Sequence, residues 1–299
     1  MHFLKRTGKT LLWPLIYLFL TASLAALIAY PVFIFSHADN ISFFRTVVSR
    51  GGQVVLLLGI FPLFRWLRLP FSTLGFSKDL AIHLVWGFIL GTLMLTAHVI
   101  GLVELGVRGF IWTKLQTVDF IPLFIKSCIT GFSVGMLEET IFRGALIGAL
   151  NPISGHFMAV MVSSLYYASL HFIGTLWSTD LNLVGLDTGF RIALDGFSHL
   201  IQAPPDAFIG LFVAGAFLGF IRYLFPQKLG ICIGVHAGWV FVIQTGNNLT
   251  YYIPESKFSF LVGLHDTYVG VLSSVWLGFF IIGLILIVRY FRKRSILFL

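Results

Sequence analysis

The stretch ITGFSVGMLEETIFRGALIGAL, residues 129–150, decides what kind of protein this is. A helix needs about 20 predominantly apolar residues to cross a bilayer, and this segment meets that requirement. Two acidic residues, Glu138 and Glu139, nevertheless stand side by side near its middle. A charged side chain in hydrocarbon costs at least ~2.5 kcal/mol, so an acid inside a span indicates a functional site by default.

The rest of the chain has the composition of a membrane protein. Of its 299 residues, 58% are hydrophobic and 11% are charged, and the mean hydropathy is +0.94. A soluble domain is typically about 25% charged. We therefore predict an all-α polytopic integral membrane protein with about eight transmembrane helices. The expected spans are residues 11–35, 52–68, 80–103, 119–150, 156–176, 206–225, 229–249 and 267–290.

We expect three divisions along the chain. Residues 1–118 supply N-terminal membrane helices, residues 119–249 form the core that carries the chemistry, and residues 250–299 add an outer loop, a last span and a basic tail. The two cysteines, Cys128 and Cys232, each fall within a span, and we expect them to behave as small apolar residues.

Basic residues predict the orientation of the spans. With the N-terminus in the cytoplasm, twelve of the twenty Lys and Arg residues fall on the cytoplasmic side and six on the other. This excess predicts that both chain ends face the cytoplasm. The formal charge of +8 is spread between spans rather than gathered in a patch, which argues against nucleic acid as a partner.

The longest expected connection, residues 177–205, lies on the outer side. Its stretch FRIALDGFSHLIQ, residues 190–202, has the pattern of a short helix lying on the membrane surface. A plain surface loop is the other interpretation.

The acidic pair divides into two roles by helical geometry. Residues four apart share a face of a helix, and Glu placed before Arg is the favourable order, so Glu139 is expected to pair with Arg143. Adjacent residues point about 100° apart, so Glu138 faces elsewhere. Glu138 is then available as a general base or acid. The alternative is that the charges only fix helix packing.

Two histidines within spans are candidate partners of Glu138. His171 ends the run SSLYYASLH, with Tyr167 one turn earlier on the same face. His236 is flanked by Gly234 and Gly238, and small residues allow helices to approach closely. Each histidine could equally be a satisfied core residue, and we assign His98 to the core.

These residues form a recognisable set of three motifs. Glu138-Glu139-Thr-Ile-Phe-Arg143 matches an EExxxR pattern, Tyr167 to His171 matches FxxxH with tyrosine for phenylalanine, and His236 to Val240 is similar to HxxxN. In this order they resemble the CPBP family of intramembrane endopeptidases, which includes CAAX proteases and bacteriocin-processing relatives. The motifs cover residues 119–249.

The resemblance implies a role for each residue. Glu138 would activate water with help from His171, and His236 would stabilise the oxyanion. Glu139 and Arg143 would hold the architecture, with Tyr167 supporting. The chain departs from the family at Val240, where many members have asparagine. Since losing one oxyanion donor costs roughly 3–4 kcal/mol of transition-state stabilisation, this departure puts CAAX-type specificity in doubt.

Metal dependence stays open at this point. Glu138, His171 and His236 could instead ligate zinc, since three protein ligands and a water are the usual catalytic zinc set. We favour a site that requires no cofactor, because a buried glutamate can serve as the base in hydrolysis without a metal.

We therefore expect an intramembrane endopeptidase that cleaves a peptide or a membrane-anchored or lipidated protein. The bilayer is its medium, and the resemblance points to the bacterial inner membrane. Two alternatives remain. Intramembrane carboxylates and histidines also build the proton relays of coupled transporters, although no internal repeat is evident. A non-catalytic membrane scaffold or immunity-type protein of the same fold is the other, and Val240 is its support.

Overall fold

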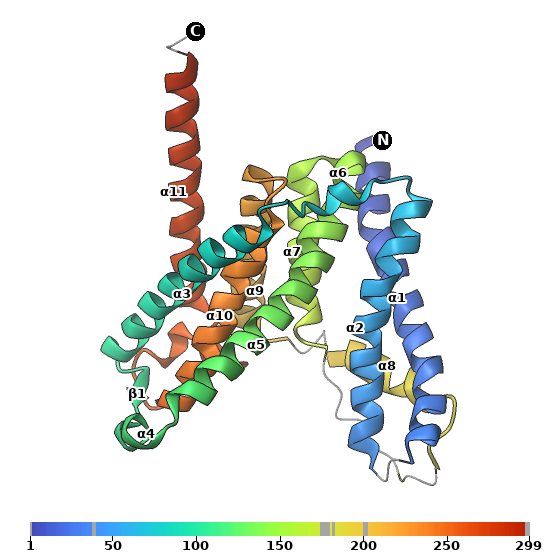
Figure 1. Ribbon diagram of the computed structural model, residues 1–299, viewed down its shortest axis with the longest axis horizontal. Helices are drawn as coiled ribbons and strands as arrows, with labels where there is room; N and C mark the ends of the chain where they lie inside the picture. The colour runs from blue at the N-terminus through green and yellow to red at the C-terminus, as the bar shows by residue number, and fades with distance from the viewer. Residues whose placement is uncertain (1, 38–39, 174–179, 181–182, 200–202, 297–299) are drawn as a thin grey trace. The chain divides into compact units, whose positions relative to one another are not determined.

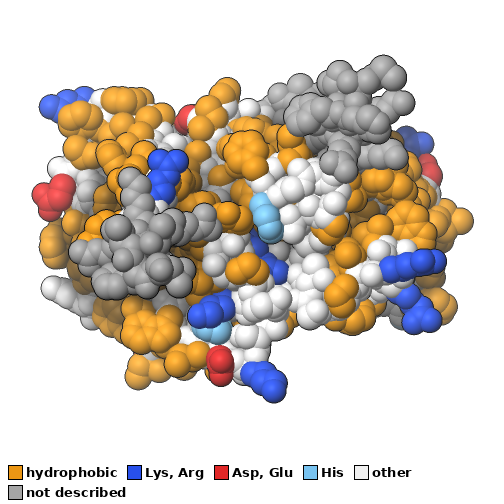
Figure 2. Space-filling model, turned by 90° about the horizontal axis from the view of Figure 1, so that it is seen from above, with side chains coloured by type: hydrophobic (Ala, Val, Ile, Leu, Met, Phe, Trp, Pro, Cys, Tyr) orange, Lys and Arg blue, Asp and Glu red, His pale blue; other side chains and the backbone are white. Residues whose placement is uncertain are grey.

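Seven of the helices in the described part of the chain are long and apolar enough to cross a membrane. The computed structural model describes residues 2–37, 40–173, 180, 183–199 and 203–296. The seven segments are Leu12–Ser36, Ile41–Trp66, Leu80–Glu104, Phe120–Ser154, Pro205–Leu224, Leu229–Leu249 and Val271–Tyr290. Apolar side chains also cover much of the face shown in Figure 2. The prediction of an all-α polytopic membrane protein is confirmed.

The fifth of the eight expected spans, residues 156–176, is shorter than predicted. Helix α7 (His156–Leu170) has 15 residues, so it is ~22 Å long and falls short of a ~30 Å hydrocarbon core. The last expected residues of that span, 174–176, lie outside the described part. A turn at Gly155, with φ of 81°, joins α7 to the preceding helix α6 (Ile147–Ser154). Glycine adopts this backbone conformation without the steric cost of a Cβ atom.

Contacts divide the chain into two compact units, each containing segments from both halves of the sequence. Unit 1 comprises residues 1–74 and 140–203, and unit 2 comprises residues 75–139 and 204–299. The three divisions predicted along the sequence stay a prediction, because these units are defined by packing and not by consecutive blocks of chain.

Unit 1 is built on the antiparallel pair α1 (His2–Ser36) and α2 (Ile41–Trp66), which lie side by side in Figure 1. It also contains the short 3₁₀ helix η1 (Phe71–Leu74), the π-helix η2 (Thr140–Leu146), α6, α7 and α8 (Thr188–Ser198). Asn40 caps the start of α2 by accepting a hydrogen bond from the backbone N–H of Phe43 at 2.8 Å.

The described part of the 177–205 connection contains a helix, α8. Residues 188–198 form a helix rather than a plain loop, while residues 177–179, 181–182 and 200–202 lie outside the described part. Ile192 joins the buried cluster of Ala29, Phe33 and Phe44 on α1 and α2. Gly189 approaches Ala26 so closely that a Cβ there would lie 2.5 Å from the Ala26 carbonyl oxygen.

Unit 2 has α10 (Leu229–Leu249) at its centre, packed against both α3 (Leu80–Glu104) and α5 (Phe120–Glu139). Helices α4 (Trp112–Thr117), α9 (Pro205–Leu224) and α11 (Val271–Ile296) complete it, with the 3₁₀ turn η5 (Ser259–Leu261). Without a hydrophobic drive between helices in lipid, association depends on close packing at small residues. Figure 1 shows α3, α10 and α5 running alongside one another.

Glycines set the spacing of these three helices. A Cβ on Gly91 of α3 would lie 2.2 Å from the Val235 carbonyl oxygen, and one on Gly131 of α5 would lie 2.5 Å from that of Ala237. These distances are impossible for any side chain, so both helices contact the α10 backbone directly.

A small polar assembly closes one end of unit 2. Strand β1 (Arg108–Phe110) pairs antiparallel with β2 (Thr250–Tyr252), Arg108 opposite Tyr252. Arg108 is buried, stacks on the Tyr268 ring at 4.0 Å and donates to the hydroxyls of Thr250 and Thr267 at 2.9 and 2.7 Å. Burial lowers the pKa of Arg108 and raises that of Tyr268. His98, buried as expected for a core residue, contacts the Tyr268 carbonyl at 3.1 Å.

Candidate active site

The two acidic residues occupy the last turn of α5. Glu139 is the final α-helical residue and is fully buried, whereas the Glu138 side chain is 21% exposed. The backbone then changes to the π-helix η2, a wider turn that is frequent at functional sites. Adjacent positions on the helix therefore differ in environment, as the 100° offset between neighbours predicts.

Helix α10 brings His236 to this turn. Gly135 lies one turn before Glu139 on α5, and a Cβ there would lie 2.8 Å from the Ile233 carbonyl oxygen and 3.6 Å from the His236 Cβ. The absence of a side chain at Gly135 lets the α10 backbone approach α5, and His236, which is 4% exposed, is held at the contact.

One imidazole ring contacts both glutamates. His236 Nδ1 lies 2.8 Å from Glu139 Oε1, a hydrogen-bond distance, and His236 Nε2 lies 3.9 Å from Glu138 Oε2. An ionised carboxylate only accepts, so with Glu139 charged the ring carries its hydrogen on Nδ1. The buried carboxylate thus fixes the ring orientation and turns Nε2 toward Glu138. Catalytic and metal-binding histidines are often oriented in the same way, by a carboxylate that is hydrogen-bonded to one ring nitrogen.

A second group of candidate residues is assembled within unit 1. The Arg143 guanidinium, on η2 and fully buried, lies 4.3 Å from the centre of the Tyr167 ring. The Tyr167 ring is also 4.5 Å from the ring of His171, the residue that ends α7. His171 Nδ1 is 2.8 Å from the Tyr167 carbonyl oxygen. Because a carbonyl only accepts, Nδ1 carries the hydrogen and Nε2 is the basic nitrogen of the neutral ring.

Unit 2 thus assembles Glu138, Glu139 and His236, and unit 1 assembles Arg143, Tyr167 and His171. The roles given to the six residues stay predictions, as does the pairing of Glu139 with Arg143. The Glu139–His236 hydrogen bond was not expected from the sequence. The glycines at positions 131 and 135 of α5, four residues apart, were a signal that another helix would pack closely against α5 at this turn.

The helices that carry these six residues are similar to those of a known family. Residues 120–242 match the family model described as type II CAAX prenyl endopeptidase Rce1-like. No curated protein and no solved structure matches the chain. The Rce1-like segment covers about two fifths of the sequence and contains all six candidate residues.

The match confirms the family resemblance drawn from the three motifs. It supports a protease of the CAAX type in general, and the apolar helices support its location in a membrane. The Rce1-like segment begins at the start of α5 and ends within α10. Helices α1 to α3 lie outside it.

The side chains around His236 supply part of the ligand set that a zinc ion requires. Glu138 and His236 Nε2 face each other, and Glu139 holds the other ring nitrogen, as outer carboxylates do behind metal-binding histidines. A catalytic zinc needs three protein ligands. In the ranges that the structure describes, no group of three or more His, Cys, Asp or Glu side chains is placed to hold a metal ion. Zinc held by Glu138, His171 and His236 stays an alternative.

Proposed function

We propose that this protein is an intramembrane endopeptidase that hydrolyses a peptide bond with water activated by Glu138. The observation that carries the proposal is the contact of one buried imidazole with two intramembrane glutamates inside the Rce1-like segment. A purely structural ion pair explains Glu139 and His236. It leaves unexplained why Glu138, partly exposed, is turned to the other nitrogen of the same ring.

In the proposed reaction, Glu138 takes a proton from water as the water oxygen attacks the peptide carbonyl carbon. His171 is proposed to assist as a second base through its Nε2. The tetrahedral intermediate then collapses with cleavage of the C–N bond, and the leaving amine receives the proton that Glu138 holds. General acid and base steps of this kind typically contribute 10²–10⁴-fold each.

His236 is proposed to stabilise the oxyanion, and its contacts define how. Nε2 can donate a hydrogen bond to an oxyanion only when the ring is protonated on both nitrogens. Glu139, 2.8 Å from Nδ1, favours that imidazolium form by its negative charge. Glu139 is therefore proposed as a positioning residue that acts through His236, in addition to any part it has with Arg143.

The substrate is proposed to be a peptide or a membrane-anchored or lipidated protein. It would be cut in a bacterial inner membrane, with both ends of the protease in the cytoplasm. No metal is required in this mechanism.

The test is cleavage of a farnesylated peptide ending in a CAAX sequence, and of its unmodified counterpart, by purified protein in liposomes. We expect Glu138→Gln to lose at least 10²-fold in rate while reaching wild-type abundance in the membrane. Glu104→Gln, at an exposed acid that ends α3, is the matched control and should cleave as the wild type does. Cleavage by Glu138→Gln at the wild-type rate would remove the assignment.

Val240 favours one competing function. It is half-buried, one turn after His236 on α10, where the motif of many family members carries asparagine. A chain that keeps the helical arrangement but lacks an oxyanion donor could serve as a non-catalytic membrane partner. A cellular role that survives loss of Glu138, His171 and His236 together would favour that function.

A further inference from the structure

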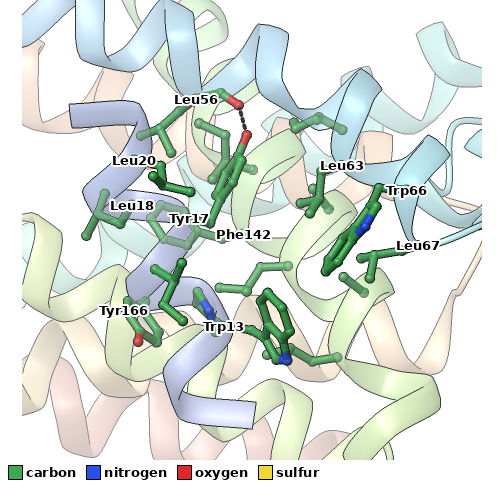
Figure 3. A pocket seen from close by; sticks show the side chains of 18 of the residues that line it. Trp13, Tyr17, Leu18, Leu20, Leu56, Leu63, Trp66, Leu67, Phe142 and Tyr166 are labelled. Atoms are coloured by element: carbon green, nitrogen blue, oxygen red, sulfur yellow. Dashed lines mark hydrogen bonds between the residues drawn. The ribbon is translucent and has the colours of Figure 1, made fainter. Parts of the chain in front are cut away.

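Unit 1 contains an apolar cavity that the proposed reaction does not use. It has a volume of about 380 Å³ and lies between α1, α2, η2, α6 and α7. Figure 3 shows Trp13 and Tyr17 of α1 facing Leu63 and Trp66 of α2, and Phe142 and Tyr166 also line the cavity. All of its lining residues are Ala, Ile, Leu, Phe, Pro, Trp or Tyr.

The hydroxyl group of Tyr17 is turned to the backbone. It donates to the Leu56 carbonyl oxygen at 2.6 Å, as drawn in Figure 3. The cavity therefore presents ring faces and aliphatic groups to an occupant. Apolar cavities of this kind stay dry and take up hydrocarbon.

The cavity extends over about one leaflet of a bilayer. One end of it lies where the α1 span starts and α2 ends, at the Trp13–Trp66 pair with ring centres 5.1 Å apart, and we place the membrane–water interface there. Tryptophan is enriched at such interfaces. The lining runs to Leu20 on α1 and back to Leu56 on α2, which is ~10 Å and ~16 Å of helix from the surface. Half of a ~30 Å hydrocarbon core is ~15 Å.

Two positive charges lie beside this end of the cavity. Arg65 and Arg68 flank the lining residues Trp66 and Leu67, and both are exposed. Basic groups beside a membrane surface attract anionic headgroups by about 1 kcal/mol each.

We propose that this cavity holds one acyl chain of an anionic glycerophospholipid from that leaflet, with its phosphate beside Arg65 and Arg68. The chain would contact Phe142, whose ring packs edge-on against Tyr167 with centres 5.3 Å apart. A bound lipid would thereby support the packing of Tyr167 against Arg143 and His171. The proposal does not depend on proteolysis.

The test uses phosphatidylglycerol with a photoactivatable diazirine in one acyl chain, in nanodiscs containing the full-length protein. Phosphatidylcholine with the same chains is the comparison. After illumination, we expect peptides containing residues 141–150 to be labelled several-fold more by phosphatidylglycerol. Ala149→Phe, which fills the cavity from a partly exposed lining position, should remove this labelling. Ala81→Phe, on an exposed position of α3, should leave it unchanged.

A second pair of variants tests the headgroup without altering the cavity. Arg65→Gln with Arg68→Gln should abolish the preference for phosphatidylglycerol, while Arg45→Gln with Arg50→Gln, at the opposite end of α2, should preserve it. Equal labelling by the two lipids, or labelling that Ala149→Phe does not change, would overturn the proposal. Displacement of the label by a farnesylated peptide would also overturn it, because the cavity would then belong to the substrate.

Discussion

At the scale of single residues, His236 is the side chain that contacts both intramembrane glutamates. Its Nδ1 is bonded to a fully buried carboxylate and its Nε2 faces a partly exposed one. The two glutamates are neighbours in sequence, but their environments differ because they point in different directions from the same turn. A glutamate that is buried and hydrogen-bonded suits positioning, and one that is partly exposed suits exchange of a proton with water.

The role of Glu139 can be separated from that of a packing residue. Glu139→Gln keeps the side-chain shape but removes the negative charge that favours the imidazolium form of His236, so Nε2–H becomes a weaker donor to the oxyanion. We expect cleavage to fall by about 10²–10³-fold, the loss typical of a missing oxyanion donor. The rate should be measured across pH 5–9, since a loss of the supporting charge also displaces the pH profile. An unchanged rate and profile would leave Glu139 with a packing role alone.

A substitution at Val240 tests whether an added hydrogen-bond donor increases the cleavage rate. Val240→Asn restores the residue of the family motif, one turn from His236, and adds a hydrogen-bond donor to the oxyanion region. One such donor is worth about 10²–10³-fold in kcat, so we expect at least a 10-fold increase in cleavage rate in the liposome assay. Val240→Leu, which adds no donor, is the control. No increase with asparagine would mean that position 240 does not reach the oxyanion.

At the scale of elements, the position of His236 depends on glycine contacts along α10. Gly87 and Gly91 of α3 and Gly131 and Gly135 of α5 meet its backbone directly. The three helices therefore pack at a separation that no larger residue allows. In the same unit, the β1–β2 pair and the stacking of Arg108 on the Tyr268 ring hold together the segments that follow α3 and α10.

A side chain added at a glycine of α3 that contacts the α10 backbone should displace α10. In Gly91→Val, the new Cβ would lie 2.2 Å from the Val235 carbonyl oxygen. Overpacking of this kind typically costs about 1–3 kcal/mol, so the thermal unfolding midpoint in detergent should fall and cleavage should weaken with it. Gly101→Val, on the same helix with no atom within 4 Å of its Cβ, is the control. Equal midpoints for both variants would contradict the close contact.

At the scale of the whole molecule, orientation depends on whether the short helix α7 returns the chain across the membrane. Seven described helices are long enough to span, which by themselves would put the termini on opposite sides. The excess of Lys and Arg at the cytoplasmic ends of the eight predicted spans instead favours an even number of crossings. Helix α7, ending at His171, would be the eighth crossing.

Reporter fusions decide between these topologies. We expect a fluorescent protein at the C-terminus to be bright, as on the cytoplasmic side, and alkaline phosphatase fused there to be inactive. The same phosphatase fused after Thr117, in the connection before α5, should be active. An active phosphatase at the C-terminus would show an odd number of crossings, and α7 would then only enter the membrane.

Much of the fold and of the candidate site could be predicted from the sequence alone. Hydropathy predicts the membrane class and the approximate limits of the spans, because every backbone polar group in lipid must be satisfied within a helix. The adjacent glutamates and the spacing to Arg143, His171 and His236 predict the family. The length of α7 was wrong by several residues, since an apolar run does not reveal where a helix ends. The partner of Glu139 across 97 residues was also missed.

The sequence by itself determined which residues lie in the membrane and which of them carry charge, since these depend on composition and local periodicity. The tertiary structure decided that Glu139 bonds to His236, and that α1, α2 and η2 enclose an apolar cavity. Both depend on which helices touch and how closely. Contacts between helices depend on small residues from segments that are far apart in the sequence. The residue pattern of a single helix does not show which of these segments will meet.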